Sequence, residues 1–395
     1  MGHIISSTDQ SRKFKICILT TVDSSLDNLF PEFYPRVLDQ GFEVVGISAD
    51  GPFIENVRDQ GVRVITVPLT RKISPIKDCY CLWTLFHIFR KEKFDLIHYS
   101  TPKVSLLGAL AGRLSECPAL LYTLRGLGYS GYHGLTRWVG KLCEKIACRS
   151  ADRIIAISPS LIKEARREKL APNKVFELIG KGSSKGVNLE KFSLSDSTLE
   201  RARQIRQTFH MESSDLVIGY AGRMTAEKGI GELAAAFRNL SQDRPNIHLM
   251  LIGHADQRSP LANSFVCELQ SHERIHIISF TNNLADYYGA MDIAVLPSYR
   301  EGFGNSLIEA SAMALPVIAT NVVGCCDAVV HGKTGLLIEP GNANDLQAAL
   351  SELLDDKNRR DEMGRNGRRW VEKNFDRNAI WEGLVTRYSE MVSKN

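Results

Sequence analysis

Short apolar runs that alternate with helix-forming segments constrain the fold of this chain more than any other feature. The run Phe14 to Thr21 (FKICILTT) is typical of a buried strand and Phe30 to Gln40 of a helix, and the alternation continues to the strand pattern Asp152 to Ile157. At Leu216 to Tyr220 the pattern starts again. Strands and helices in turn predict a parallel sheet with helices on both faces and ligands at the carboxyl ends of the strands. The sequence therefore predicts an α/β protein with two doubly wound, Rossmann-like domains.

A glycine-rich segment, GKGSSKGVNLEKF at 180–192, separates the two series of strands and helices. Its glycines and small polar residues favour a linker, with a phosphate-binding loop as the alternative. We therefore expect a first domain over 1–190 and a second over 191–365, followed by amphipathic helices over 366–395. A chain of 395 residues with 44% apolar residues is long enough for two such cores.

The stretch 299–316, YREGFGNSLIEASAMALP, predicts an anion site in the second domain. It follows the strand pattern Ile293 to Leu296 and leads into a helix expected over Leu307 to Ala314. The first amides of a helix have no partner within it and lie at the positive end of its dipole, which favours an anion. Gly302 and Gly304 let a phosphate approach the backbone closely.

Two carboxylates, Glu301 and Glu309, frame this turn. An ionised carboxylate only accepts hydrogen bonds, so both suit sugar hydroxyls rather than a phosphate. A ligand with phosphates between two sugars, which is a nucleotide sugar, would match the turn and both acids. The residues alone leave two alternatives open, because Ser306 to Glu309 also fits a capping box and Glu301 also fits an ordinary loop acid.

Together with two further segments, this stretch resembles the E-x7-E signature of the retaining nucleotide-sugar glycosyltransferases of family 4. The segments AGRMTAEKGI at 221–230 and VVGCCDAVVHGKTGLLIEP at 322–340 come in the family's order and spacing, and the resemblance covers most of the chain. It implies the GT-B fold, in which two Rossmann-like domains face each other across a cleft and the last helices, here 366–395, pack on the first domain. The linker 180–192 is similar to that of members that build bacterial surface glycans.

The resemblance also implies roles for residues of the second domain. Glu301 would orient the donor sugar, and Glu309 would bind the ribose. Arg223 and Lys228 would neutralise the leaving diphosphate and so count with Glu301 as catalytic. The other expected donor-binding residues are Gly222, Gly302, Phe303, Gly304 and Asn305. Because the sequence has no Asp-x-Asp pair flanking a strand end and no His/Cys/Asp cluster, we expect no metal site and no cofactor besides the donor itself.

The loop GLGYSG at 126–131 satisfies the G-x-G-x-x-G pattern of dinucleotide binding. It comes several strands into its domain and precedes a basic helix, whereas that fingerprint belongs on the first strand. In the family that the chain resembles, this loop lies on the acceptor side. The expected acceptor-side residues are Arg125, Gly126, Tyr129 and Lys103, with Arg125 and Tyr129 as replacements for a histidine that many relatives have. Two other functions stay open: an NAD-dependent oxidoreductase that uses this loop, and a protein that binds sugar nucleotides without turnover.

The resemblance further implies the substrates. The expected donor is a uridine diphosphate sugar with a hexose or an N-acetylhexosamine, by its frequency in the family. The expected acceptor is a growing bacterial surface glycan on a polyprenyl diphosphate carrier, which the basic first domain would meet at the membrane.

The first half of the chain is the basic half, with 27 Lys and Arg against 19 Asp and Glu in residues 1–190. On one expected helix, four basic residues recur at every fourth position beside Trp138: Arg137, Lys141, Lys145 and Arg149. This stripe fits a solvated helix face or a contact with a membrane surface, and it belongs to no nucleic-acid-binding motif.

No apolar run approaches a membrane span, the polar start is no signal peptide, and nine cysteines without zinc spacing suit reduced thiols. The expected location is the cytoplasm, with peripheral contact at the inner face of the plasma membrane as the finer alternative.

Overall fold

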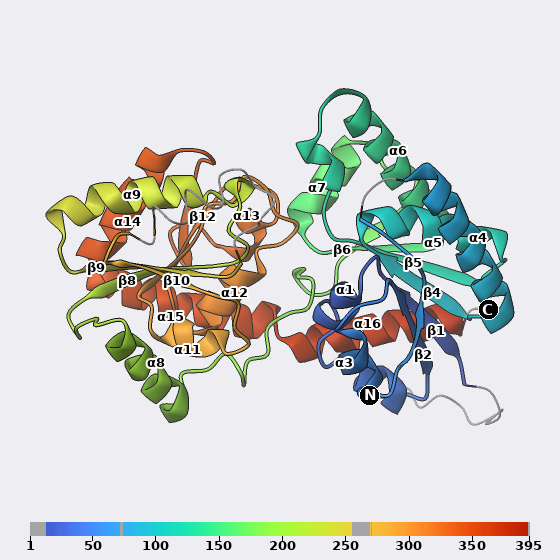
Figure 1. Ribbon diagram of the computed structural model, residues 1–395, viewed down its shortest axis with the longest axis horizontal. Coiled ribbons are helices and arrows are strands. Elements are labelled where there is room, and N and C mark those ends of the chain that lie inside the picture. The colour runs from blue at the N-terminus through green and yellow to red at the C-terminus, as the bar shows by residue number, and fades with distance from the viewer. Residues whose placement is uncertain (1–12, 72–73, 255–268, 270, 394–395) are drawn as a thin grey trace. The chain divides into compact units, whose positions relative to one another are not determined.

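The structure is a computed structural model that describes residues 13–71, 74–254, 269 and 271–393. These residues divide into two compact units. Unit 1 contains the described residues of 1–156, 165–177 and 381–395, and unit 2 contains those of 157–164 and 178–380. Each unit is a parallel sheet with helices packed on it (Figure 1).

Unit 1 has a seven-stranded sheet in the order β3-β2-β1-β4-β5-β6-β7, and neighbouring strands are parallel. Every residue of β4 and β5 is buried, as expected of a sheet covered on both faces. The strands are β1 (Lys15–Leu19), β2 (Glu43–Ser48), β3 (Arg63–Thr66), β4 (Leu96–Ser100), β5 (Ala119–Leu124), β6 (Arg153–Ala156) and β7 (Phe176–Glu177). The strand order reverses between β1 and β4, so the loops after these two strands diverge and leave room for a ligand.

The helix α5 of unit 1 packs between α4 and α6 (Figure 1). The helices are α1 (Asp23–Asn28), α2 (Tyr34–Asp39), α3 (Ile54–Arg58), α4 (Pro75–Glu92), α5 (Pro102–Leu114) and α6 (Gly134–Ser150), with a short 3-10 helix, η1 (Gly128–Gly131), before α6. The helix α7 (Pro159–Arg167) begins in unit 2 and ends in unit 1.

The last helix, α16 (Arg377–Val392), contributes its residues from Trp381 onward to the core of unit 1. The ring of Trp381 lies 4.9 Å from that of Phe33 and 6.3 Å from that of Phe30, and its Nε1 donates to the carbonyl of Pro31 at 3.0 Å. Trp381 is only 1% exposed, so the chain's end is an integral part of this unit.

Unit 2 has a six-stranded sheet in the order β10-β9-β8-β11-β12-β13, again with parallel neighbours. The strands are β8 (Leu216–Ala221), β9 (Ile247–Ile252), β10 (Ile275–Ile278), β11 (Ile293–Leu296), β12 (Val317–Thr320) and β13 (Gly335–Ile338). The helices are α8 (Asp196–Thr208), α9 (Ile230–Asp243), α11 (Leu284–Gly289), α12 (Asn305–Ala312), α13 (Cys325–Ala328), α14 (Ala343–Asp355) and α15 (Lys357–Asn374), with a short 3-10 helix, η2 (Ala226–Lys228). Here the order reverses between β8 and β11, which predicts the ligand position of this unit.

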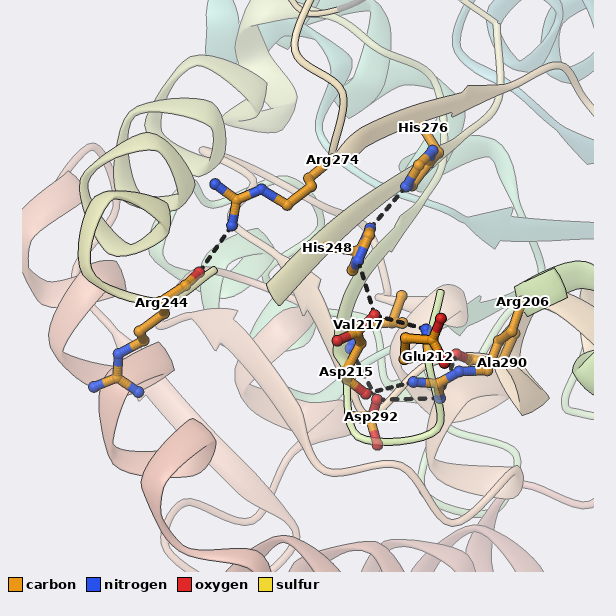
Figure 2. A network of polar contacts seen from close by, with 10 residues as sticks. All are labelled: Arg206, Glu212, Asp215, Val217, Arg244, His248, Arg274, His276, Ala290 and Asp292. Atoms are coloured by element: carbon orange, nitrogen blue, oxygen red, sulfur yellow. Dashed lines mark hydrogen bonds and ion pairs between the residues drawn. The ribbon is translucent and has the colours of Figure 1, made fainter. Parts of the chain in front are cut away.

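The amino ends of the unit 2 strands carry a polar network (Figure 2). The Oδ2 atom of Asp215 lies 3.2 Å from Nε2 of His248, and Nδ1 of His248 lies 3.0 Å from Nε2 of His276. Beside them, Arg206 pairs with Asp292 at 3.5 Å. Burial, helped by the neighbouring imidazole, lowers the pKa of His276 to about 4, so the histidines favour the neutral form. This network links the amino ends of the strands, whereas ligands are expected at their carboxyl ends.

The two units differ from the expected domain ranges in three places. Residues 157–164 and 178–190 belong to unit 2 rather than to the first domain, and residues 366–380 belong to unit 2 rather than to the returning helices. A backbone contact accounts for the last two, because the amide of Val187 donates to the carbonyl of Phe375 at 2.8 Å and the amide of Arg377 donates to the carbonyl of Val187 at 3.0 Å. The linker and the end of α15 therefore hold each other within unit 2.

Candidate functional site

The candidate site of unit 2 lies at the carboxyl ends of β8 and β11, where the strand order reverses. The loop after β8 runs through Gly222 and Arg223 to η2, and the loop after β11 runs through 297–304 to α12. These are the two segments that the sequence analysis selected, 221–230 and 299–316. They are adjacent because β8 and β11 pair, with Ile293 opposite Ile218.

Glu301 and Lys228 contact each other at the centre of this site. The Nζ atom of Lys228 donates to Oε1 of Glu301, and the side chains of both residues are only 15% exposed. The hydroxyl of Ser298 donates to the same carboxylate oxygen at 3.0 Å. The structure thus brings together two residues predicted as catalytic, and it shows Glu301 as a largely buried, ion-paired acid of the loop after β11.

Gly229 explains why Lys228 reaches this carboxylate. It has a φ of +70°, and an added Cβ would lie 2.1 Å from the carbonyl oxygen of Pro297. The start of α9 therefore presses directly against the end of β11, and only glycine fits there. The glycine fixes the ammonium of Lys228 beside the loop that carries Glu301.

Arg223 and its neighbours add an exposed cationic edge to the site. The side chain of Arg223 is 61% exposed, and its Nη2 lies 4.0 Å from Oε1 of Glu227. Glu227 is held more closely by Arg300, at 2.5 Å, and this hydrogen bond lowers the pKa of the Glu227 carboxyl. An exposed ion pair at 4.0 Å is weak, so Arg223 can exchange its partner for an anionic ligand. Arg300 lies next to Glu301 in the sequence but was not predicted, because nothing marked it out from an ordinary surface arginine.

The turn before α12 differs from the expected one in its hydrogen bonds. Helix α12 begins at Asn305 rather than Leu307, and the amide of Asn305 donates to the carbonyl of Phe303 at 2.9 Å. That amide is therefore engaged within the turn, and the amides of Gly302, Phe303 and Gly304 are the candidates for an anion. Gly324 packs directly against this turn, since a Cβ added at Gly324 would lie 2.7 Å from the carbonyl carbon of Gly302.

Glu309 is buried and paired with a lysine of the linker. It is 8% exposed, and its Oε1 lies 3.6 Å from Nζ of Lys185. The capping-box interpretation of Ser306 and Glu309 is wrong, because Gly304 is the N-cap of α12 and no side chain caps this helix.

Two linker residues, Ser183 and Lys185, also belong to the site, and sequence reasoning did not predict them. The hydroxyl of Ser183 donates to Oδ1 of Asn305 at 3.0 Å, and Lys185 pairs with Glu309 as described. The alternative of a phosphate-binding loop for 180–192 pointed toward such contacts, but no residue was assigned from it. Separation in sequence hid the connection, because Ser183 and Asn305 are 122 positions apart.

Unit 1 contains a pocket of about 480 Å³ at the carboxyl ends of β1 and β4. Of the expected acceptor-side residues, Lys103 and Tyr129 line it. The ammonium of Lys103 lies 2.5 Å from Oδ1 of Asp78 and donates to Oγ1 of Thr70 at 3.0 Å. Tyr129 is 4% exposed and packs so closely on α6 that a Cβ at Gly140 would lie 2.6 Å from its own Cβ.

Arg125 and Gly126 are not among the residues that line this pocket. The guanidinium of Arg125 lies over the ring of Phe30, 5.3 Å from its centroid, in the aromatic cluster of Trp381. Burial lowers the pKa of Arg125 to about 10, so the group stays charged at neutral pH. Of the four expected acceptor-side residues, Arg125 and Gly126 therefore lie outside this pocket.

The glycine triplet at 126–131 does not have the geometry of a dinucleotide fingerprint. Gly128 to Gly131 form the 3-10 helix η1, and α6 begins only at Gly134 with His133 as its N-cap. The triplet follows the fifth strand of its sheet in chain order. A dinucleotide loop opens directly into the helix after the first strand, so this arrangement does not favour an oxidoreductase.

The basic stripe on α6 is partly neutralised by Glu168, an acid in the turn directly after α7. Arg137 pairs with Glu168 at 3.1 Å, and Lys141 pairs with the same carboxylate. Arg149 donates to the carbonyl of Leu170 at 3.3 Å. Half of the stripe is thus a structural ion-pair cluster rather than a free cationic surface.

Membrane-spanning helices and clusters of metal ligands are absent from the described part of the chain. No helix there is long and apolar enough to cross a membrane. No group of three or more His, Cys, Asp or Glu side chains there is arranged to hold a metal ion.

Two family models match the chain, one over each unit. The model described as "Glycosyltransferase Family 4" matches residues 32–180, and the model described as "Glycosyl transferases group 1" matches residues 202–370. The chain is 34% identical over 382 residues to the capsular polysaccharide biosynthesis glycosyltransferase CapM of Staphylococcus aureus, covering 96% of this chain and 98% of the relative. It is 24% identical to the UDP-Gal:alpha-D-GlcNAc-diphosphoundecaprenol alpha-1,3-galactosyltransferase of Escherichia coli, covering 89% of this chain and 90% of the relative.

The fold also matches solved structures. The Anabaena protein HepE, in complex with UDP-glucose, superposes with a TM-score of 0.79 over 95% of this chain and 99% of HepE, at 20% sequence identity. At that identity the match concerns the fold alone. With the two parallel sheets described above, it confirms the expected α/β fold class.

Proposed function

This chain belongs to the glycosyltransferases of family 4, and on that premise we propose that it transfers a hexose or an N-acetylhexosamine from a uridine diphosphate sugar to a polyprenyl-diphosphate-linked glycan. The product would serve the assembly of a bacterial surface polysaccharide. The names of two relatives support this proposal, since CapM acts in capsular polysaccharide biosynthesis and the Escherichia coli enzyme is named for UDP-Gal and a diphosphoundecaprenol acceptor.

The contact between Lys228 and Glu301 carries the proposal. A partly buried ammonium and a carboxylate share one hydrogen bond at the switch point of the sheet, beside the exposed Arg223. A nucleotide sugar supplies what each partner needs: its diphosphate takes the cations, and its sugar hydroxyls donate to the carboxylate. The donor can therefore take the place of the ion pair between Lys228 and Glu301 and still leave both charges with partners. An unpaired charge at this degree of burial would be costly in free energy.

The chemical step follows from the same groups. The bond between the anomeric carbon and the phosphate oxygen breaks, and the acceptor oxygen bonds to that carbon on the same face, which gives retention. The acceptor proton passes to the leaving phosphate. Lys228, Arg223 and the amides of Gly302 to Gly304 stabilise the charge that grows on the leaving diphosphate. Because these groups are fixed cations and dipoles, we propose that turnover needs no metal ion.

Glu309 and the linker residues place the nucleoside. Glu309 would accept hydrogen bonds from the ribose hydroxyls, with its charge balanced by Lys185 at 3.6 Å. Ser183 fixes the first residue of α12 through Asn305.

Exposed apolar side chains support a peripheral contact of unit 1 with a membrane. On α6, Leu135 is 75% and Trp138 61% exposed, and on α4, Ile76 is 87% and Trp83 59% exposed. Tryptophan beside aliphatic residues is typical of the membrane interface. We propose that this surface brings the enzyme to its lipid-linked acceptor, with less help from the basic stripe than the sequence suggested.

Flotation with anionic vesicles tests this membrane contact. Wild type should float with the vesicles and Trp138→Glu should remain in the bottom fraction, and equal flotation would contradict the proposal.

Glu301→Gln tests the transfer reaction. The substitution keeps the size of the side chain but removes the charge, and kcat should fall about 100- to 1,000-fold. Glu200→Gln, an exposed acid on α8 with a side chain 56% exposed, is the matched control and should keep full activity. The assay is release of uridine diphosphate from uridine diphosphate sugars in the presence of lipid-linked acceptor, with and without a chelator.

Unchanged turnover of Glu301→Gln would contradict the assignment. A protein that binds the donor and never releases nucleotide would instead be the non-catalytic sugar-nucleotide-binding protein.

A further inference from the structure

The pocket of unit 1 is apolar along most of its wall. Residues of α5 and α6 line it, and its apolar lining includes Val22, Leu106, Leu107, Tyr132 and Val139. Its volume of about 480 Å³ is in the range of pockets that enclose small organic ligands, roughly 300–1,000 Å³. Such a wall suits hydrocarbon better than a sugar, which would need a row of polar partners.

Three of the four charged residues that line the pocket, Asp78, Lys103 and Glu144, have hydrogen-bond or ion-pair partners. Lys103 is paired with Asp78 at 2.5 Å, and the hydroxyl of Tyr122 and the carboxyl of Glu144 are hydrogen-bonded to each other. Burial raises the pKa of Glu144 to about 7, so this carboxyl is largely neutral in slightly acidic solution. Apart from Arg71, which is exposed and also lines the pocket, the charged side chains of the wall are therefore engaged with one another or with neighbouring residues.

The pocket is continuous with the exposed apolar side chains of α6. Val139 is 37% and Tyr132 56% exposed, yet both also line the pocket. Leu135, Trp138 and Leu142 are one helical turn or less from Val139 and are 75%, 61% and 41% exposed. An exposed apolar patch that leads into an apolar pocket marks a site for an apolar ligand.

We infer that this pocket binds hydrocarbon of the lipid acceptor, namely the isoprenoid units next to the diphosphate of a polyprenyl carrier. The inference rests on the proposed function, because that function supplies an acceptor with a long apolar chain. A hydrocarbon chain is already in an apolar environment within the bilayer, so moving it into an apolar pocket brings no net gain in hydrophobic free energy. The role of the pocket is therefore to hold the isoprenoid in one position. It thereby fixes the glycan end relative to unit 1, while the rest of the carrier stays in the membrane.

Farnesyl diphosphate, used below its micelle concentration, is the probe. Saturating uridine diphosphate is present throughout to occupy the diphosphate site of unit 2, and inorganic pyrophosphate is the headgroup control. Leu106→Trp fills the pocket from a half-buried position on α5. Leu114→Trp, at the 60% exposed end of the same helix and outside the pocket, is the matched control.

The expected result is that the dissociation constant for farnesyl diphosphate rises at least tenfold in Leu106→Trp and is unchanged in Leu114→Trp. A second measurement needs no variant. Cys143 lines the pocket, so its alkylation in the wild type, followed by mass spectrometry, should slow at least fivefold with farnesyl diphosphate and not with pyrophosphate. The exposed Cys79 serves as the internal reference.

Three results would overturn the inference: equal affinity of Leu106→Trp and wild type, an unchanged alkylation rate of Cys143, or equal protection by pyrophosphate. Failure of the proposed function has a different signature, because the wild type would then neither bind uridine diphosphate nor release it from a uridine diphosphate sugar. A protein that turns over donor but does not bind farnesyl diphosphate would refute only the isoprenoid site.

Discussion

His98 should make the stability of unit 1 depend on pH. Its ring is 1% exposed in β4, with the hydroxyl of Tyr388 2.6 Å from Nδ1 and that of Thr123 2.7 Å from Nε2. The ring of Phe30 packs edge-on against it, and Arg125 is the nearby charge. Burial, and to a smaller extent Arg125, lowers the pKa of His98 from 6.5 to about 3.

The sign follows from linkage. A histidine with a lowered folded pKa stabilises the fold fully above the unfolded value of 6.5, and this contribution is lost as the pH falls, because only the unfolded chain takes up the proton. Each pH unit in this window is worth about 1.4 kcal/mol. Between pH 7.5 and 5.0 the loss from this one residue is therefore about 2 kcal/mol of the free energy of unfolding.

The perturbation is His98→Gln, compared with wild type in urea unfolding at pH 7.5 and at pH 5.0. Whatever the stability of the variant at pH 7.5, its loss of stability between the two pH values should be smaller than that of wild type by about 2 kcal/mol. Thr123→Val removes one hydroxyl and keeps the imidazole, so it should retain most of the pH dependence. Equal losses in wild type and His98→Gln would refute the reasoning.

Three further predictions concern single side chains. Trp381→Ala should lower the free energy of unfolding of unit 1 by about 3–5 kcal/mol in a urea titration, because it empties the space beside Phe33; a loss below 1 kcal/mol would contradict the packing of α16. Gly229→Ala should cost at least about 1–3 kcal/mol and weaken binding of uridine diphosphate in calorimetry, since its Cβ would collide with Pro297, whereas Gly231→Ala, with nothing within 4 Å of the added Cβ, should do neither. Lys185→Met should raise KM for the donor about tenfold with little change in kcat, because it removes the charge beside Glu309; an unchanged KM would exclude the linker from donor binding.

The sequence was sufficient to predict the two sheets because the information is local. Apolar runs such as FKICILTT at 14–21 and the strand pattern at 216–220 each specify a strand, and their alternation with helices specifies parallel pairing. The order of the strands is not local information. Only the pairing of β8 with β11 shows that Lys228 and Glu301, 73 positions apart, share a hydrogen bond.

Partners from distant segments also decided which predicted residues act together. The sequence showed the cations on α6 but not that Glu168 neutralises two of them. It marked Arg125 by its position after a strand, whereas Phe30 places its guanidinium in an aromatic cluster. A charge pattern on one helix therefore predicts a surface only after the neighbouring elements are known.

The central claim is that the cations at the carboxyl end of β8 bind the diphosphate of the donor, and calorimetric titration of uridine diphosphate tests it most directly. The wild type should bind with or without a chelator. Lys228→Met, checked for folding by circular dichroism, should bind at least about tenfold more weakly because it loses a charge-assisted hydrogen bond. Lys357→Met, an exposed lysine with a side chain 75% exposed, should bind like wild type. Equal affinity of Lys228→Met and wild type would contradict the account.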